Sequence, residues 1–394
     1  MSEENVQLVR ERLSAFLGGD VERALADLDP DAITYRAPPL PDPQAYRGPE
    51  GVLQAFADWT ADFGEFEMST GEFIDAGDRV VVEVFQRAKG QASGAEVGGR
   101  FWFVYEIADR RIVRQDIFNA KRQAFEAAGL DGEPAVAIVV PPGDGETITA
   151  LERRDVALLA DREEISVTWS RYAPGEVGPD PHVHREHTDS WYVLDGELTF
   201  ALGPEAERVR VGPGSFVAVP PNLIHSFANE AAADARFLNF HTPDGGFAAY
   251  MRGRRDGLDT GFDSHDPPAD GGLGAGEAVI SGPGEGERLV SGNRTLLLKG
   301  PLVDLCFAEF TIEGQFDGPG LHRHDAEVDS FYVLEGELEL TVEDSIRPAV
   351  PGTLASVPPG VRHTFSHRGS GGVRFLNVHA PDAGFAAFLR RVSD

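Results

Sequence analysis

Residues 182–197 read HVHREHTDSWYVLDGE, and residues 322–337 read HRHDAEVDSFYVLEGE. The two segments align without a gap at an offset of 140 residues, from 182 to 322. Further along, RFLNFHTPDGGFAAYMR (236–252) returns as RFLNVHAPDAGFAAFLR (374–390) at an offset of 138 residues. A repeat of this length indicates a duplicated domain and not a solenoid of small units.

Short strand-like segments dominate both copies. SWYVLDGELTFAL and SFYVLEGELELTV are examples, and Gly- and Pro-containing turns separate them from the next segments. Frequent short strands of this kind are typical of a β-sandwich or a β-barrel. Gly196 and Gly336 end the matching YVLDG and YVLEG segments, where a turn needs a residue that accepts a positive φ.

The histidines of the repeat have the spacing of metal ligands in a barrel. In a strand, residues i and i+2 point to the same side, so His182 and His184 are expected to face the interior together. His225 follows a PPN turn and opens a strand, SFA, that can lie antiparallel to them. Three imidazoles and one carboxylate would suit a divalent transition metal with positions left open. The candidate ligands are His182, His184, His225 and Asp189 in copy one, and His322, His324, His363 and Asp329 in copy two.

Other readings of these residues stay open. Glu186 and Glu327 are alternative carboxylates, and a metal-free barrel could use its histidines to bind an organic ligand or to pair with neighbours. The remaining histidines divide by whether they recur. His241 and His379 recur and are expected to tie the last strand to its turn or to line a pocket, whereas His187 and His367 occur in one copy each and are expected at the surface or rim.

These residues resemble the two sequence motifs of the cupin superfamily. The first motif is Gly, five residues, His-x-His, three or four residues, Glu, six residues, Gly. Both copies have His-x-His, four residues, Asp, six residues and Gly. The second motif is Gly, five residues, Pro-x-Gly, two residues, His, three residues, Asn. It is matched by Gly214, Pro220, His225 and Asn229, with Asn222 in place of Gly, and by Gly352, Pro358, Gly360 and His363, with His367 in place of Asn.

The resemblance covers residues 135–258 and 277–394 and implies two all-β cupin barrels, of the double-stranded β-helix or jelly-roll type. Both copies place Asp where the family has its metal-binding Glu. Asp is shorter by one methylene, about 1.5 Å. Its carboxylate can reach a metal after a backbone shift, act through water, or hydrogen-bond a ligand histidine. The short side chain slightly favours the indirect roles, since three histidines alone can hold a metal.

The first 130 residues have a different pattern. Helical periodicity over 5–19 is followed by a short helix at 21–28 and a third helix after Pro49. Strand-like segments then occupy 66–74, 78–88, 99–108 and 111–120, and a helix over 121–130 closes the region. Helices followed by an antiparallel sheet predict an α+β domain.

This region resembles the SnoaL-like branch of the cone-shaped fold shared with nuclear transport factor 2. The segments GDVERALADLDPDAITYRAP, AYRGPEGV, FIDAGDRVVVEV and AFEAAGL carry the resemblance. Asp116 shares a face of the last strand with Ile112, Arg114 and Phe118. If that face lines the cone, Asp116 can act as a general acid or base. The alternative is an exposed charge paired with Arg114.

Composition excludes several classes of protein. The net charge of −30 argues against binding to nucleic acid or anionic membranes, which need basic clusters. No apolar segment reaches about 18 residues, and the acidic start MSEENVQLVRERL does not resemble a signal peptide. A cytoplasmic protein is therefore expected. The single cysteine, Cys306, excludes an internal disulfide and is predicted to be a buried core residue.

The sequence therefore predicts an α+β cone domain (1–130) followed by two cupin barrels (135–258 and 277–394). The leading hypothesis is a metal-dependent oxygenase, isomerase or lyase that uses Fe, Mn, Zn or Ni and acts on a small organic molecule. One alternative is a non-catalytic binding protein or sensor. Another places the chemistry in the cone domain, with the cupins as scaffold. The oligomeric state stays open between a homodimer and barrels that pair within one chain.

Overall fold

The computed structural model describes residues 2–37, 44–61, 63–91, 96–118, 121–130, 136–258, 261–268 and 276–393. The chain divides into two compact units, Met1–Pro134 and Ala135–Asp394. Within the described ranges, no helix combines the length and the apolar character needed to cross a membrane.

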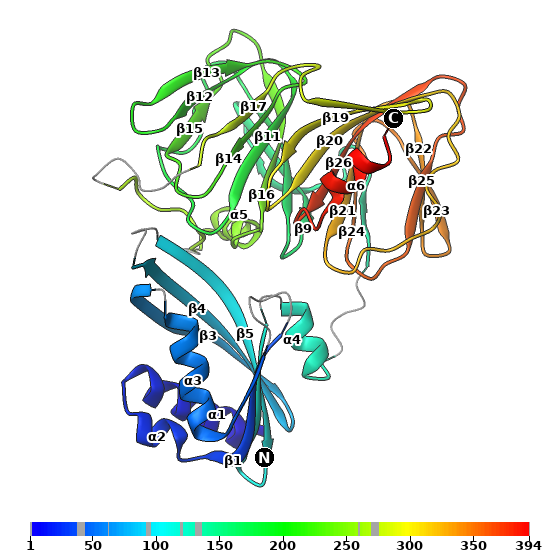
Figure 1. The fold of residues 1–394 in the computed structure, drawn as a ribbon. Helices are drawn as coiled ribbons and strands as arrows, with labels where there is room; N and C mark the ends of the chain where they lie inside the picture. Colours follow the sequence, from blue (N-terminus) through cyan, green and yellow to red (C-terminus); the bar gives the residue numbers. More distant parts are fainter. Residues whose placement is uncertain are drawn as a thin grey trace. The chain divides into compact units, whose positions relative to one another are not determined.

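The first unit is a curved six-stranded sheet with helices on both faces (Figure 1). The strand order is β2-β1-β6-β5-β4-β3, antiparallel except for the parallel pair β1 and β6. The elements are α1 (Ser2–Leu17), α2 (Val21–Leu25), β1 (Leu28–Arg36), β2 (Ala45–Arg47), α3 (Gly48–Thr60), β3 (Phe63–Ala76), β4 (Arg79–Gly90), β5 (Glu96–Ala108), β6 (Arg111–Phe118) and α4 (Lys121–Ala127).

Apolar side chains alternate between the two faces of this sheet, and each face has its own hydrophobic core. Val80 and Val82 of β4 belong to a core with Leu13 of α1. Val81, between them, belongs to the opposite core with Ala124 of α4. Because successive side chains in a strand point to opposite faces, one apolar segment serves both layers.

The predicted α+β cone is confirmed, including its four long strands and its closing helix. The edge pair β1 and β2 was not predicted as strands. The segment LDPDAITYR contains Pro and two Asp residues, which are depleted in strands, and this composition hides β1.

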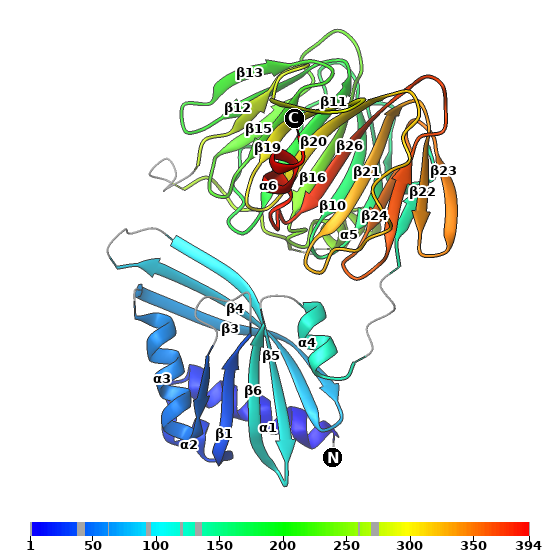
Figure 2. The same ribbon diagram turned by 45° about the vertical axis from the view of Figure 1, so that its right-hand side comes forward.

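The second unit contains two barrels of the same topology, each built from a seven-stranded and a three-stranded sheet (Figure 2). The predicted all-β barrels are confirmed. Barrel one contains β8 (Glu146–Ala150), β9 (Arg154–Asp161), β10 (Ser166–Tyr172), β11 (Thr188–Asp195), β12 (Leu198–Leu202), β13 (Glu207–Val211), β14 (Phe216–Val219), β15 (His225–Ala228), β16 (Ala235–Thr242) and α5 (Phe247–Asp256). Barrel two contains β18 (Glu287–Ser291), β19 (Arg294–Pro301), β20 (Cys306–Glu313), β21 (Val328–Glu335), β22 (Leu338–Val342), β23 (Ser345–Ala349), β24 (Leu354–Val357), β25 (His363–Ser366), β26 (Gly372–Ala380) and α6 (Phe385–Arg391).

Each barrel lends one strand to the other. Strand β7 (Ile138–Val140) precedes barrel one in the sequence but pairs with β24 of barrel two. Strand β17 (Val279–Ser281) precedes barrel two and pairs with β14 of barrel one. This exchange adds a strand at one edge of each seven-stranded sheet, where unpaired backbone groups would otherwise remain. The predicted boundaries 135–258 and 277–394 stay a prediction.

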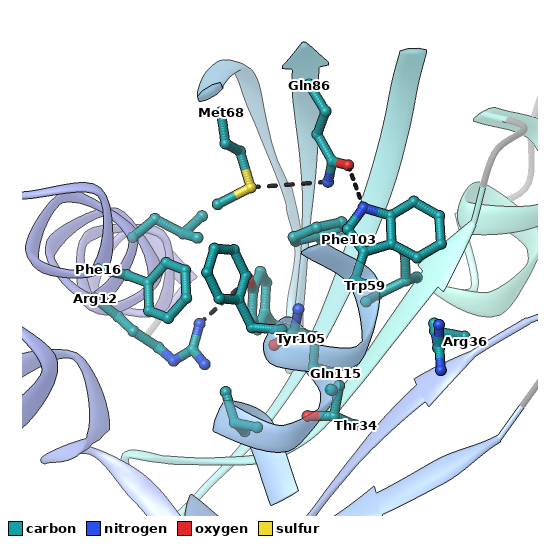
Figure 3. A pocket seen from close by; sticks show the side chains of 15 residues that line it. Arg12, Phe16, Thr34, Arg36, Trp59, Met68, Gln86, Phe103, Tyr105 and Gln115 are labelled. Carbon is teal, nitrogen blue, oxygen red and sulfur yellow. Dashed lines mark hydrogen bonds between the residues drawn. The ribbon is translucent and has the colours of Figure 1, made fainter. Parts of the chain in front are cut away.

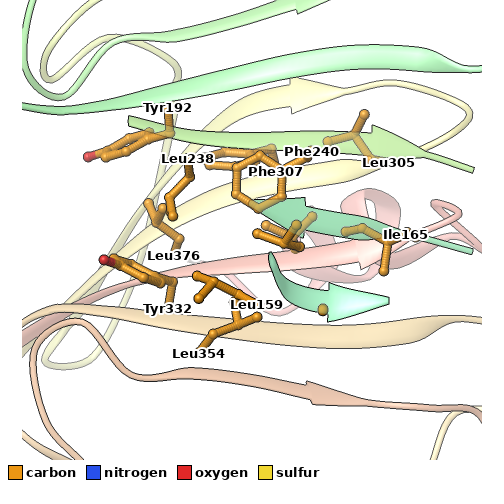
Figure 4. Packing of buried hydrophobic residues seen from close by; sticks show 14 of the residues in the cluster. Leu159, Ile165, Tyr192, Leu238, Phe240, Leu305, Phe307, Tyr332, Leu354 and Leu376 are labelled. Atoms are coloured by element: carbon orange, nitrogen blue, oxygen red, sulfur yellow. The ribbon is translucent and has the colours of Figure 1, made fainter. Parts of the chain in front are cut away.

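The two barrels also share a hydrophobic core (Figure 4). Phe216 of β14 stacks on Phe307 of β20 with ring centroids 4.2 Å apart, and Tyr192 of β11 stacks on the same ring at 5.8 Å. All three rings are almost completely buried. Such a core joins the two copies within one chain. Cys306, predicted to be buried, belongs to the separate core of barrel two and has 0% exposure.

Gly336 offers a test of the predicted turn after β21. Its φ is +74°, and a Cβ there would lie 2.5 Å from the carbonyl oxygen of Gly372. Gly314 has a similar φ of +72° but open space around it. Gly314→Ala is expected to cost about 1–2 kcal/mol for the left-handed backbone alone. Gly336→Ala is expected to cost roughly 1–3 kcal/mol more, because backbone atoms must move. Equal losses in urea unfolding would contradict the close approach.

Candidate metal centres

The first histidine of each copy faces the third across a short antiparallel bridge. In barrel one the N–H of His182 donates to the carbonyl of His225 at 3.1 Å, and the N–H of His225 donates back at 3.0 Å. In barrel two His322 and His363 exchange the same two bonds at 3.1 and 2.7 Å. Both copies therefore have the antiparallel approach expected from the PPN and PPG turns.

The turn before the third histidine also holds the second one. The N–H of Asn222 donates to the carbonyl of His184 at 2.6 Å, and the N–H of Gly360 donates to that of His324 at 2.7 Å. Both turn residues have positive φ, +68° and +85°. Asn tolerates this backbone better than most side chains, so the exchange of Asn for Gly preserves the turn.

The imidazoles of barrel one are fixed through Nδ1. A backbone carbonyl can only accept a hydrogen bond, so each ring carries a proton on Nδ1, and the neutral ring has an unprotonated Nε2. The Nε2 atoms of His184 and His225 are buried and have no hydrogen-bond partner among the described residues. Unprotonated nitrogens that converge in this way suit a metal ion. The Nδ1 partners are the carbonyls of Asp180 for His182 (2.8 Å), Leu223 for His225 (2.9 Å) and Asp263 for His184.

Asp189 at the start of β11 completes this group. Its Oδ2 lies 3.6 Å from Nε2 of both His184 and His225. Two ligands of one zinc-like ion, each about 2.0–2.2 Å from it, lie roughly 3–3.5 Å apart. The other oxygen, Oδ1, accepts a hydrogen bond from Nδ2 of Asn239 at 2.5 Å. The carboxylate therefore presents one oxygen to the histidines while Asn239 holds the other.

The charges in barrel one favour metal binding at neutral pH. Burial and the neighbouring imidazoles of His225 and His184 lower the pKa of His182 to about 4, so this ring is neutral. Burial opposes ionisation of Asp189, but the surrounding histidines hold the pKa of its carboxyl well below the usual range. A neutral imidazole beside an ionised carboxylate is the protonation state that a metal ion requires.

Barrel two repeats this arrangement with one difference. The Nδ1 atoms of His322 and His363 donate to the carbonyls of Gly320 (2.9 Å) and Val361 (3.0 Å). The Nδ1 atom of His324 instead lies 3.0 Å from Oε1 of Glu327. Oδ2 of Asp329 lies 3.0 Å from Nε2 of His363 and 3.6 Å from Nε2 of His324. Its Oδ1 accepts a hydrogen bond from Nδ2 of Asn377 at 2.5 Å.

A fourth histidine lies beside each predicted group. His241 is paired directly with Asp189 across β16 and β11, and its Nε2 lies 3.6 Å from Asp189 Oδ1. His379 is the counterpart, with its Nε2 3.3 Å from the carboxylate of Asp329. The sequence left open whether these two histidines hold a turn or line a pocket. Both are buried, and each lines the pocket of its own barrel.

In each barrel a further carboxylate contacts a histidine of this region through Nδ1, but the two carboxylates come from different parts of the sequence. His187 was expected at the surface or rim, but it is fully buried, with Nε2 2.9 Å from Nδ1 of His241. Its Nδ1 faces the carboxylate of Asp263 at 2.9 Å. In barrel two, Glu327 occupies the repeat position of His187 and contacts His379 directly at 3.1 Å. Glu327 therefore lies on the Nδ1 side of its histidines, whereas Asp329 lies on the Nε2 side.

His367, also expected at the surface, is buried as well. Its Nδ1 and Nε2 lie 2.7 and 3.0 Å from the carbonyl oxygens of Glu337 and Gly371, and it takes no part in the histidine group of barrel two. Glu186, the alternative carboxylate of copy one, contributes its backbone N–H to Asp263 at 2.7 Å. Within the part of the chain that the structure describes, neither residue belongs to a group whose ligand atoms converge.

Each group opens into a pocket of its own. The pocket of barrel one has a volume of about 710 Å³, and that of barrel two about 750 Å³. The first is lined partly by charged groups, among them Arg154, Glu176 and Arg254, and by Phe262 of the linker. The second has an apolar wall from α6, which includes Phe385 and Phe388.

Asp116 is placed differently from the predicted acid or base. The cavity of the first unit is lined by Gln115 and Ile117, the neighbours of Asp116 on β6, and not by Asp116 itself (Figure 3). Asp116 is instead bonded to Nε of Arg114 at 2.8 Å. Asp116 therefore points away from the cavity, because successive strand residues alternate. The predicted shared face is also wrong, since Ile112 packs in the core with Val80 and Phe118 in the opposite core with Val81.

Comparisons with known proteins agree with this architecture. The family described as "Cupin domain" matches residues 168–241 and 308–379, and the family described as "SnoaL-like domain" matches residues 9–115. The chain is a bicupin with an amino-terminal SnoaL-like domain.

Quercetin 2,3-dioxygenase of Bacillus subtilis (strain 168) is similar to this bicupin over 95 residues at 27% identity. The match covers 24% of the chain and only 28% of that relative. Among solved structures, protein Ylba from E. coli matches at 13% identity with a TM-score of 0.46, over 63% of this chain and 92% of that one. Oxalate decarboxylase from Bacillus subtilis matches at 16% identity with a TM-score of 0.45, over 64% and 78%.

Proposed function

We propose that each barrel of this bicupin binds one divalent transition metal ion through three histidines and one aspartate. The observation that carries this proposal is the set of buried Nε2 atoms without partners, such as those of His184, His225 and His324, whose Nδ1 atoms are held by fixed neighbours. A buried polar atom without a partner is costly, and a metal ion would remove that cost.

Asp189 and Asp329 are proposed as direct ligands. The sequence slightly favoured an indirect role, because Asp is short. The geometry supports direct contact, since Oδ2 of each carboxylate faces the Nε2 atoms while Asn239 or Asn377 holds Oδ1. An aspartate that only oriented histidines would lie on their Nδ1 side, where Glu327 lies.

The activity proposed for this chain is metal-dependent conversion of a small organic molecule. A bound ion would polarise a substrate oxygen or take a ligand at its open coordination positions. Pockets of about 710 and 750 Å³ have the size of small-molecule sites. Among oxygenase, isomerase and lyase chemistry, the partial similarity to a quercetin dioxygenase supports oxygenase. The chain's own residues would fix the ligand geometry through the two asparagines and the Nδ1 acceptors.

Protein purified without added metal is expected to contain about two equivalents of a transition metal, one for each barrel. Asp329→Asn should weaken binding in barrel two by more than about 100-fold, since even residues that only orient a ligand cost 10–100-fold. Competition with a chelator, followed by elemental analysis, measures both.

Asp325→Asn is the matched control, because Asp325 lies four residues away and its side chain is 91% exposed. Its metal content should equal that of the wild type. Full retention of metal by Asp329→Asn would remove the aspartate from the ligand set. Two bound ions without turnover of any oxygen- or isomerisation-type substrate would favour the binding protein over the enzyme.

A further inference from the structure

The first unit contains a small cavity that combines aromatic walls with buried positive charge. It lies between the helices α1 and α3 and the inner face of the sheet and has a volume of about 60 Å³ (Figure 3). Two of its lining residues, Arg12 and Arg36, are only 4% and 5% exposed. The sequence did not predict arginines at this cavity.

Arg12 has no carboxylate partner among the described residues. Its Nη1 donates to the hydroxyl of Tyr105 at 3.4 Å, and the guanidinium lies 5.4 Å from the centre of that ring. Its Nε is buried and has no hydrogen-bond partner. A guanidinium has five N–H donors, so most of the capacity of Arg12 is unused.

Arg36 also lacks a direct carboxylate in the part of the chain that the structure describes. Its Nη2 donates to the hydroxyl of Tyr46 at 2.5 Å, and Tyr46 in turn donates to the carboxylate of Asp58 at 2.8 Å. Its Nε is buried without a partner, and the guanidinium lies 5.8 Å from the ring centre of Trp59. Among the described residues, Arg36 therefore reaches a negative charge only through a tyrosine.

Buried arginines without a direct carboxylate partner are unexpected in so acidic a chain. The sequence has 65 acidic and 35 basic residues, so carboxylates are abundant. Partly buried arginines elsewhere have them, as Arg171 does with Asp155 at 2.6 Å and Arg374 with Glu309 at 3.0 Å. A buried charge without a counter-charge is strongly unfavourable. Within the described ranges Arg12 has no internal counter-charge, which indicates that an external anion supplies it.

We propose that this cavity is a binding site for a small carboxylate. The guanidinium of Arg12 pairs with the carboxylate oxygens, the geometry for which Arg is best suited, and Arg36 adds positive potential. Phe103 and Trp59 contact the short apolar part of the ligand. A site for one water needs at least about 10–15 Å³ on the same measure, so the cavity has room for a molecule the size of acetate.

The test uses the full-length chain with acetate as the probe and NMR or calorimetric titration as the measurement. Arg12→Met keeps the length of the side chain and removes the charge, and it is expected to weaken acetate binding at least tenfold. Arg10→Met is the matched control, because Arg10 lies on the same helix with an exposed side chain. It should bind acetate as the wild type does. Acetate that binds only in the barrels would bind all three proteins equally, and that result would overturn the proposal.

Thermal unfolding separates a binding role for Arg12 from a structural one. Without acetate, Arg12→Met should be as stable as the wild type or more stable, because an unpaired buried charge is removed. Acetate should raise the melting temperature of the wild type and of Arg10→Met but not of Arg12→Met. A large loss of stability in Arg12→Met without acetate would show that the bond to Tyr105 is structural. Binding of inorganic phosphate but not of acetate would overturn the carboxylate assignment.

Discussion

His182→Ala is expected to remove about one equivalent of metal and to leave barrel two fully occupied. His322→Ala is expected to do the reverse, and the double variant should contain no metal. The reason is that each group draws all its ligand atoms from one barrel, within 4.8 Å of one another. A metal at 100 times its dissociation constant stabilises the folded state by about 2.7 kcal/mol, so each single variant should also melt at a lower temperature. Elemental analysis and calorimetry measure the two effects.

His367→Ala is the control for the loss of a buried histidine that is not a ligand. Its Nδ1 bond to the carbonyl of Glu337 contributes to folding, so this variant should lose stability and retain metal. If a single ligand variant emptied both barrels, the sites would be coupled through the shared core around Phe307 and not independent. Comparing turnover in the two single variants would then assign the chemistry to one barrel.

The metal-ligand candidates could be predicted because the same spacing of histidines and aspartate occurs in both copies. His182, His184 and Asp189 lie within eight residues, and the turn that delivers His225 carries its own signature of two prolines and a residue with positive φ. The asparagines that hold the aspartates were also within reach of the sequence. Asn239 and Asn377 stand at matching positions two residues before His241 and His379, on the same face of the last strand.

Asp263 could not be predicted, because it lies outside the repeated segments, after residue 258. It contacts His187 from 76 residues away in the sequence, a separation that no local pattern reports. The strand exchange has a similar cause. The segments of β7 and β17 each precede the barrel that they do not join, and a three-residue strand carries no signal of its partner.

The burial of the two cavity arginines could not be predicted from the sequence. Arg12 lies on the helix that the sequence predicts from its periodicity over 5–19. Arginine is rarely buried, so the sequence suggests an exposed position for it. Only the fold shows that Arg12 packs against the ring of Tyr105 with 4% exposure. Likewise, the side chain of Asp116 alternates with those that line the cavity, and its direction depends on the irregular pairing of β5 with β6.

Metal binding in barrel two is expected to depend more steeply on pH than in barrel one. Burial lowers the pKa of His324, but Asp329 and Glu327 outweigh it and raise the pKa to about 9. Metal-free His324 is therefore protonated at pH 7, and a metal must displace that proton. Each pH unit below 9 should weaken binding about tenfold, so roughly 100-fold is expected between pH 9 and pH 7. In barrel one, His182 has a pKa of about 4 and loses no proton in this range.

The single-barrel variants make this difference measurable. His182→Ala isolates barrel two and should give a dissociation constant that falls as pH rises to 9 and levels above it. His322→Ala isolates barrel one and should give a flatter profile, because Nδ1 of His184 faces a backbone carbonyl where His324 faces a carboxylate. Glu327→Gln in the His182→Ala background removes one of the two charges that raise the pKa of His324. This variant should bring the pH profile of metal binding closer to that of barrel one. An unchanged profile would show that Glu327 does not determine the pH dependence.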